Sequence, residues 1–503
     1  MTNLEAFFLA FTNWEMILYI AIGVFVGIYV GAIPGLSVTM AVSLLISFTF
    51  SWDIYPALAV MIGIFCGGVY GGSRSAILLN IPGAPAAVAT GFDGYPLAQK
   101  GEAGIAMGLT VIESVLGGFI GIILLLAASP LIAKIALKFS ARDFLLLGLM
   151  GLFLVGSLSR GSLIKALVTA FLGVAVGLIG MDTITAQPRM TFGILNLLGG
   201  IHFVVVMIGL FGLSEALVQL KTKVNPVKQD VKKIIPNLII VLKNLPLAIR
   251  SSLIGTFIGA LPGTGGDIAA LIAYDNAKRT VKNPTPYPFG EGAYQGVIAP
   301  EAANNACIGG AFIPMMTLGI PGDSVTAILI GAMIIHGIRP GPLLMQEQPE
   351  FFYIILGCLV LANVFLLIFG FTGIRLFCRI VEIPKAIIIP IIIILSIIGS
   401  YSINNSVVDI YWMFFFGILG YFFKMYDYPV STLVLGVILA PIIDTNFRRA
   451  IDICHGNLLE FIAGFFTNPI SLVLLLFIVF MTLPDNVKSG AVRLIKKPFT
   501  KGK

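Results

Sequence analysis

Two short segments decide how this chain folds: GAIPGLSVT at residues 31–39 and GIPGDSVT at residues 319–326. Each places a Pro-Gly pair directly after an apolar stretch and before small hydroxyl side chains, and PGLSVT and PGDSVT are near copies. Proline interrupts a helix because it lacks the backbone N–H and clashes with the preceding turn. If the flanking stretches lie in a membrane, the freed backbone groups must face protein or water, because lipid cannot hydrogen-bond to them.

The composition places most of the chain in a membrane. Of 503 residues, 58% are hydrophobic and 11% charged, with a mean hydropathy of +1.01. Soluble domains carry about 25% charged residues, so that class is excluded. Apolar stretches of about 17 to 25 residues recur along the chain, and a helix needs about 20 to span a bilayer. We expect an all-α polytopic membrane protein with roughly ten to twelve transmembrane helices.

The net charge of +7 comes from two segments rather than from a nucleic-acid-binding surface. Residues 221–250 hold seven basic residues against one acidic, a net +6. The tail from residue 483 holds six against one, a net +5, which leaves −4 for the remainder. Both segments are therefore predicted to be cytoplasmic. The first basic residue is Arg74, which disfavours a cytoplasmic N-terminus and a cleaved signal peptide.

Cysteine and histidine do not suggest a metal or disulfide framework. The five cysteines are dispersed through apolar runs without a CxxC pair, and the three histidines lie far apart. We expect packing cysteines and no zinc site.

The Pro-Gly breaks recur as an internal repeat. Pro34-Gly35 and Pro262-Gly263 are 228 positions apart, and Pro82-Gly83 and Pro321-Gly322 are 239 apart. Two correspondences in the same order indicate a duplicated unit. We divide the chain into an N-terminal membrane repeat (1–220), a basic cytoplasmic connecting segment (221–250), a C-terminal membrane repeat (251–482) and a basic cytoplasmic tail (483–503). An odd number of crossings in the first repeat would invert the second.

Later helices are expected in similar order in both repeats. The expected ranges are 103–129, 143–157, 163–180 and 198–220 in the first, and 351–371, 386–400, 407–423, 430–443 and 469–483 in the second.

Paired breaks in two repeats are typical of a transporter site built from discontinuous helices. A helix starting at such a break presents unpaired N–H groups beside its first hydroxyls, which suits an anion, while released carbonyls suit a cation. The candidate substrate-binding residues are Pro34, Gly35, Ser37, Thr39, Asn80, Pro82, Gly83, Pro262, Gly263, Thr264, Gly265, Gly266, Asn304, Asn305, Pro321, Gly322, Ser324 and Thr326. Ordinary kinks, N-capping and helix-to-helix hydrogen bonds are the competing interpretations.

A coupling cation is expected at the same breaks, with Na⁺ preferred over H⁺ because hydroxyls, amides and carbonyls outnumber carboxylates there. The candidate Na⁺ residues are Gly35, Ser37, Thr39, Gly322, Asp323 and Thr326. Two further ionisable residues lie in apolar stretches, Arg74 and Glu113. Such residues are functional candidates by default, although Arg74 could simply reach water and Glu113 could be a structural hydrogen-bonding partner. Few cations are available to neutralise an anionic substrate, so unaided capture is predicted to be weak.

The sequence motifs do not favour an enzymatic activity. Asp267 and Asp275 resemble the paired aspartates of intramembrane proteases, but Thr264 breaks the GxGD spacing. The sequence contains no Walker A motif, so we expect neither ATP hydrolysis nor a cofactor.

Longer motifs resemble a known family. They are YGGSRSAILLNIPG at residues 70–83, FDGYPLAQKGEAG at 92–104, LFGLSEAL at 210–217, GALPGTGGDIAALIAY at 259–274, and the block at 296–342 that contains PEAANNACIGG. Together with GAIPGL they resemble the large membrane subunit of tripartite tricarboxylate transporters, the TctA family, over most of the chain.

This resemblance implies a secondary carrier in the bacterial inner membrane. It implies a small membrane subunit and a periplasmic solute-binding protein as partners, and an organic carboxylate as substrate. We therefore expect a permease subunit that imports a small di- or tricarboxylate by cation symport. The alternative is a stand-alone channel or uniporter for organic anions.

Overall fold

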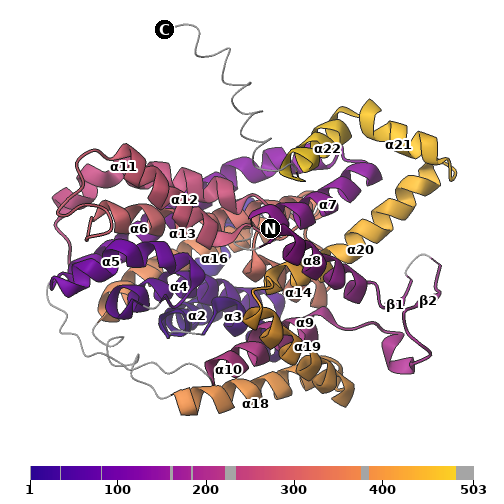
Figure 1. The fold of residues 1–503 in the computed structure, drawn as a ribbon, viewed down its shortest axis with the longest axis horizontal. Coiled ribbons are helices and arrows are strands. Elements are labelled where there is room, and N and C mark those ends of the chain that lie inside the picture. The colour runs from indigo at the N-terminus through magenta and orange to yellow at the C-terminus, as the bar shows by residue number, and fades with distance from the viewer. Residues whose placement is uncertain are drawn as a thin grey trace, which may run out of the picture.

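The computed structural model describes residues 2–33, 36–80, 82–158, 162–182, 185–220, 234–374 and 385–482 (Figure 1). The elements are α1 (Asn3–Thr12), α2 (Trp14–Ala32), α3 (Val38–Thr49), α4 (Ile54–Leu79), η1 (Pro85–Ala87), α5 (Val88–Gln99), α6 (Ala103–Ala136), α7 (Ala141–Leu158), α8 (Leu163–Gly177), β1 (Gly180–Met181), β2 (Pro188–Arg189), η2 (Leu195–Leu197), α9 (Phe203–Met207), the π-helix η3 (Ile208–Leu213), α10 (Ser214–Gln219), α11 (Leu238–Gly259), α12 (Gly265–Thr280), α13 (Gln295–Leu318), α14 (Ser324–Ile335), α15 (Pro342–Glu347), α16 (Pro349–Thr372), α18 (Lys385–Asn404), α19 (Val407–Met425), α20 (Val430–Ile453), α21 (Leu458–Thr467) and α22 (Pro469–Thr482). The described strands form only a small antiparallel pair, with Gly180 opposite Arg189. The predicted all-α polytopic architecture is confirmed.

Seven of the described helices are long and apolar enough to span a membrane. They are α2, α4, α6, α11, α16, α19 and α20, and the bent pair α21 and α22 raises the number to eight if it forms one span. Five shorter apolar segments, of 10 to 17 residues, include α3, α14 and the continuous run from α9 to α10. The short helices α3 and α14 follow Pro-Gly breaks, as expected for discontinuous helices.

The expected helices form with small shifts at their ends. The main extensions are those of α20, which ends at Ile453 rather than at residue 443, and of α6, which continues through Pro130 to Ala136 rather than ending at Ser129. A proline inside a membrane helix is tolerated where the freed backbone groups find other partners. The helix α11 begins at Leu238, so part of the stretch assigned to the connecting segment is helical. Residues 221–233 and the tail from 483 lie outside the described residues, and the division into domains stays a prediction.

Equivalent helix contacts recur in the two halves. A Cβ added at Gly27 of α2 would lie 2.5 Å from the carbonyl oxygen of Ile64 in α4, and one at Gly255 of α11 would lie 2.0 Å from that of Ala303 in α13. Gly27 and Gly255 are 228 positions apart, whereas Ile64 and Ala303 are 239 apart. These are the two spacings of the Pro-Gly breaks, so the repeat extends to helix packing.

The second break in each half packs against the helix that precedes the first. A Cβ at Gly83 would lie 2.0 Å from the Gly31 carbonyl oxygen, and one at Gly322 would lie 2.6 Å from that of Gly259. Both positions therefore require glycine because a backbone approaches closely. The result is that the two breaks of each half lie side by side.

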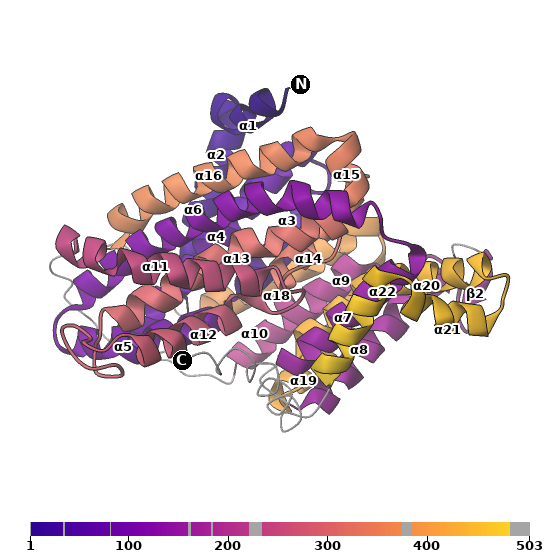
Figure 2. The same cartoon turned by 90° about the horizontal axis from the view of Figure 1, so that it is seen from above.

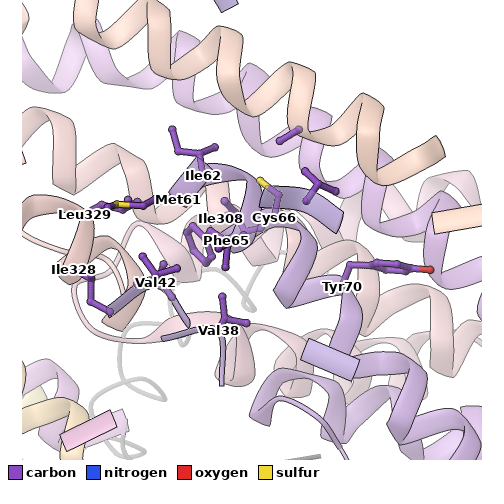
Figure 3. Close-up of a cluster of buried hydrophobic side chains, with 14 of the residues drawn as sticks. Val38, Val42, Met61, Ile62, Phe65, Cys66, Tyr70, Ile308, Ile328 and Leu329 are labelled. Carbon is purple, nitrogen blue, oxygen red and sulfur yellow. The ribbon is translucent and has the colours of Figure 1, made fainter. Parts of the chain in front are cut away.

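The helices form a large group and a smaller one. In both views α7, α8, α20 and α22 lie together on the side away from α5, α11 and α12 (Figures 1 and 2). The main apolar core extends over helices from α1 to α20, and in one part of it Val38, Phe65, Ile308 and Ile328 of α3, α4, α13 and α14 lie close together (Figure 3). This core supports the helix starts at the breaks.

Asp93 ties α5 to the loop before α13. Its Oδ1 accepts hydrogen bonds from the backbone N–H groups of Gly290, Gly292 and Ala293 at 2.8, 2.9 and 2.8 Å. The Tyr274 hydroxyl of α12 donates to Oδ2 at 2.9 Å. The aspartate of the FDGYP motif is therefore a structural anchor, fully buried in the fold.

Candidate functional site

Three of the four breaks end in the start of an α-helix. Ser37 is the N-cap of α3 and its Oγ accepts from the Met40 N–H at 3.0 Å. Thr264 precedes α12 and donates to the Leu261 carbonyl at 3.0 Å. Asp323 caps α14, where its Oδ1 accepts from the backbone N–H of Thr326 at 2.8 Å. The remaining break leads through η1 into α5.

A cavity of about 510 Å³ lies where all four breaks meet. It is lined by Ser37, Val38 and Thr39 after the first break, Ala84 to Ala86 after the second, Gly263 to Ile268 after the third and Asp323 to Val325 after the fourth. Segments between residues 37 and 325 thus line one cavity. The volume of the cavity is typical of small-molecule sites, which span roughly 300 to 1,000 Å³.

A second cavity of about 620 Å³ is larger but contains none of the break residues. It is lined by α11, the end of α12 and the start of α13, and includes Lys243 and Arg250. The smaller cavity is the better candidate because the discontinuous helices and their free helix ends converge there.

Charged side chains line the candidate cavity unevenly. Among its described lining residues, Glu215, Asp267 and Asp323 are acidic and Lys424 is basic. Lys424 Nζ lies 2.5 Å from Glu215 Oε2, so the charges of these two side chains neutralise each other. Carboxylates thus outnumber ammonium groups three to one among these lining residues, and Asp267 and Asp323 lie at the starts of α12 and α14. Such a surface attracts cations and repels a carboxylate until the charge is compensated.

Asn304 presents an unused donor to the cavity. It is 1% exposed, lines the cavity, and its Nδ2 has no hydrogen-bond partner among the described residues. A buried amide nitrogen without a partner is costly, so a ligand acceptor would stabilise it. The neighbouring Asn305 differs, because its Nδ2 donates to Ser114 Oγ at 2.8 Å and to the Glu301 carbonyl at 3.2 Å.

The predicted substrate residues divide into two groups. Those that line the cavity are Ser37, Thr39, Gly263, Thr264, Gly265, Gly266, Asn304 and Ser324. Those that do not line it are Asn80, Pro82, Gly83, Pro262, Asn305, Pro321, Gly322 and Thr326. Pro34 and Gly35 lie outside the described residues. Asn80 is the exposed C-cap of α4, in the left-handed region at φ 55°.

The candidate Na⁺ residues are similarly split. Ser37, Thr39 and Asp323 line the cavity, whereas Gly322 packs against Gly259 and Thr326 is buried in the capping box of α14. Because the Asp323 carboxylate accepts the Thr326 N–H, it occupies a donor that an incoming anion would otherwise use. The start of α14 thus favours a cation over an anion.

Sequence reasoning missed three charged cavity residues. The sequence analysis includes Glu215 only within the LFGLSEAL motif and Asp267 only in the protease alternative. It assigns no role to Lys424, near the end of α19. An ionisable residue in an apolar stretch was the available signal. The protease arrangement is not formed, because Asp275 makes an exposed ion pair with Arg279 at 2.8 Å and lies eight residues, about 12 Å, along α12 from Asp267.

Arg74 and Glu113 lie in the protein interior rather than at the cavity. Arg74 is fully buried and donates to the Tyr70 hydroxyl and, at 2.6 Å, to the Gly370 carbonyl. Glu113 is also fully buried, and neither carboxylate oxygen has a hydrogen-bond partner among the described residues. Neither lines the cavity.

Glu301 organises a buried polar cluster on the same helix as Asn304. Its carboxylate accepts hydrogen bonds from Ser73 of α4, Thr90 of α5 at 2.6 Å and Ser114 of α6 at 3.0 Å. One carboxylate therefore connects four helices directly beside the cavity wall.

Comparison with known proteins decides the family. The sequence profile described as "Tripartite tricarboxylate transporter TctA family" matches residues 17–435. The chain belongs to this family. The TctA assignment makes it a multi-pass membrane protein of a tripartite transporter, and such permeases normally work with the other components of the transporter.

Two similar proteins come from Agrobacterium vitis. An "uncharacterized 52.8 kDa protein in TAR-I ttuC' 3'region" is 37% identical over 434 residues, covering 86% of this chain and 84% of the relative. An "uncharacterized protein in TAR-II ttuC' 3'region" is 39% identical over 221 residues, covering 44% of this chain and 89% of the relative. No solved structure matches the chain.

Proposed function

We propose that this TctA permease imports a small di- or tricarboxylate across the bacterial inner membrane by cation symport. The observation that carries the proposal is the cavity at which all four breaks meet, since it combines helix starts, hydroxyls and an amide donor with an excess of carboxylates. The donors suit a carboxylate, and the carboxylates suit its accompanying cation. The periplasmic solute-binding protein and the small membrane subunit are the proposed partners.

The charge of the cavity gives the physical reason for symport. Glu215, Asp267 and Asp323 line the cavity together with one described ammonium, Lys424, and this excess of carboxylates opposes entry of an organic anion. Cation binding removes this repulsion, and the anion then strengthens cation binding by the same free energy, because linkage is reciprocal. Na⁺ remains the proposed ion, and H⁺ carried by the aspartates is its alternative. We propose no other cofactor.

Uptake into proteoliposomes tests the proposal. The chain is reconstituted with its small membrane subunit, and labelled citrate and succinate are supplied with the cognate binding protein. We expect accumulation driven by an inward Na⁺ gradient, and little uptake when the binding protein is omitted. Accumulation that persists without any cation gradient would contradict symport and favour a uniporter or channel. Uptake that follows a pH gradient and ignores Na⁺ would transfer the coupling to protons.

A further inference from the structure

Part of the cavity lining comes from elements that do not follow a Pro-Gly break. Phe211 of η3 and Glu215 of α10 come from one segment, and Lys424 of α19 and Tyr428 from another. The helices α10 and α19 lie side by side in both views (Figures 1 and 2). Lys424 is the one basic side chain among the described residues that line the cavity.

The Lys424 ion pair is held in a partly buried position. The two side chains are 26% and 16% exposed, and Nζ lies 2.5 Å from Glu215 Oε2. A lysine ammonium has three donors, so one carboxylate does not saturate it. The pair lines the same cavity as Asp267 and Asp323, and its ammonium is the available counter-charge for an anion among the described lining residues.

Glu215 has a second hydrogen-bond donor besides Lys424. Its Oε1 accepts a hydrogen bond from Gln219 Nε2 at 3.2 Å, one turn further along α10. When Lys424 moves to another carboxylate, Glu215 keeps this donor and its place on the helix. If an incoming carboxylate takes the place of Glu215 on the Lys424 ammonium, one ion pair is replaced by another of the same kind.

Building on the proposed function, we propose that Lys424 binds one carboxylate of the substrate and that Glu215 occupies Lys424 when the site is empty. A second carboxylate of the substrate then faces Asn304, which lines the same cavity and whose Nδ2 has no partner among the described residues. Two recognition points in one cavity select acids with at least two carboxylates. Glu215 acts as a competitor that weakens binding until a suitable acid displaces it.

Four variants test this assignment in the full permease with its partners. K424Q removes the ammonium, K424R keeps a cation, E215Q removes the competitor, and E215Q/K424Q removes the whole pair. K278Q is the matched control, because Lys278 is an exposed lysine on α12, a helix that also contributes to the cavity. The measurements are KM for citrate and succinate uptake, and the thermal shift of the purified protein with Na⁺ alone and with citrate.

K424Q is expected to raise KM for both acids at least about tenfold, as loss of a charge-assisted hydrogen bond does, while the Na⁺ shift stays. K424R and K278Q are expected to stay within about threefold of wild type. E215Q is expected to lower KM, and the double variant to remain as defective as K424Q.

An unchanged KM in K424Q would overturn the proposal. So would a double variant that regains wild-type KM, because the pair would then be purely structural. A wild-type protein that takes up no organic acid would instead overturn the proposed function itself.

Discussion

Glu301 and Glu113 are buried carboxylates in the same bundle with opposite surroundings. Glu301 accepts three hydroxyl hydrogen bonds, whereas Glu113 has no partner among the described residues. A charged carboxylate without partners is very costly in an apolar interior, so Glu113 is best accommodated in its neutral form. The two residues therefore respond differently to loss of charge.

Replacing Glu301 by alanine is expected to destabilise the permease strongly. The change leaves Ser73, Thr90 and Ser114 without their shared acceptor, and each buried orphan costs about 1 to 3 kcal/mol. The measurement is the melting temperature of the purified protein in detergent. E113Q is the matched control and is expected to melt near wild type, because glutamine keeps the shape of the neutral acid. A control that melts as low as E301A would show that Glu113 is charged and partnered.

At the scale of elements, the helix that precedes the first Pro-Gly break of each half packs closely against the next long helix through a glycine. Gly27 meets Ile64 between α2 and α4, and Gly255 meets Ala303 between α11 and α13. Small residues at such crossings let membrane helices approach closely, because packing replaces the hydrophobic effect in lipid. The interlock fixes where each break begins, and hence where the cavity walls lie.

Leucine at Gly27 or at Gly255 is expected to reduce the yield of folded permease to a similar degree. A backbone carbonyl 2.5 Å or 2.0 Å from the new Cβ cannot move aside as a side chain could. Gel filtration of the detergent-solubilised protein measures the folded fraction. G199L serves as control, since a Cβ there meets nothing within 4 Å. If one variant folds normally and the other does not, the two halves do not share this packing.

At the scale of the whole molecule, charge is distributed by compartment. The basic residues of 221–250 and of the tail from 483 account for more than the net charge, while carboxylates outnumber ammonium groups three to one among the described residues that line the cavity. The two basic segments predict the orientation of the chain in the membrane through the positive-inside rule. The excess of carboxylates in the cavity fits the proposed coupling of an anionic substrate to a cation.

Reporter fusions measure the predicted orientation. A fluorescent protein fused after Lys503 is expected to fluoresce, and alkaline phosphatase at the same place is expected to be inactive, because the basic tail is predicted to be cytoplasmic. Alkaline phosphatase fused at the N-terminus is expected to be active. An active phosphatase after Lys503 would contradict the predicted cytoplasmic tail, and an inactive one at the N-terminus would contradict the predicted location of the N-terminus outside the cytoplasm.

The sequence by itself determined the class of protein, the order of helices and the positions of the breaks. Hydropathy and proline act locally, so the start of α3 at Val38 and of α14 at Ser324 could be predicted from adjacent residues. The spacings of 228 and 239 between breaks even anticipated the equivalent glycine contacts. The long motifs at the breaks pointed to the TctA family, which the family match then showed.

Only the tertiary structure decided which polar residues face one cavity. Ser37 and Asp323 are far apart in sequence but line the same space, while Gly83 and Gly322, at breaks of the same kind, are taken up by backbone packing. The pairing of Glu215 with Lys424 depends on α10 lying beside α19, a contact that no local pattern encodes. Local composition specifies where a helix starts, but the direction in which a side chain points is set by the helices packed around it.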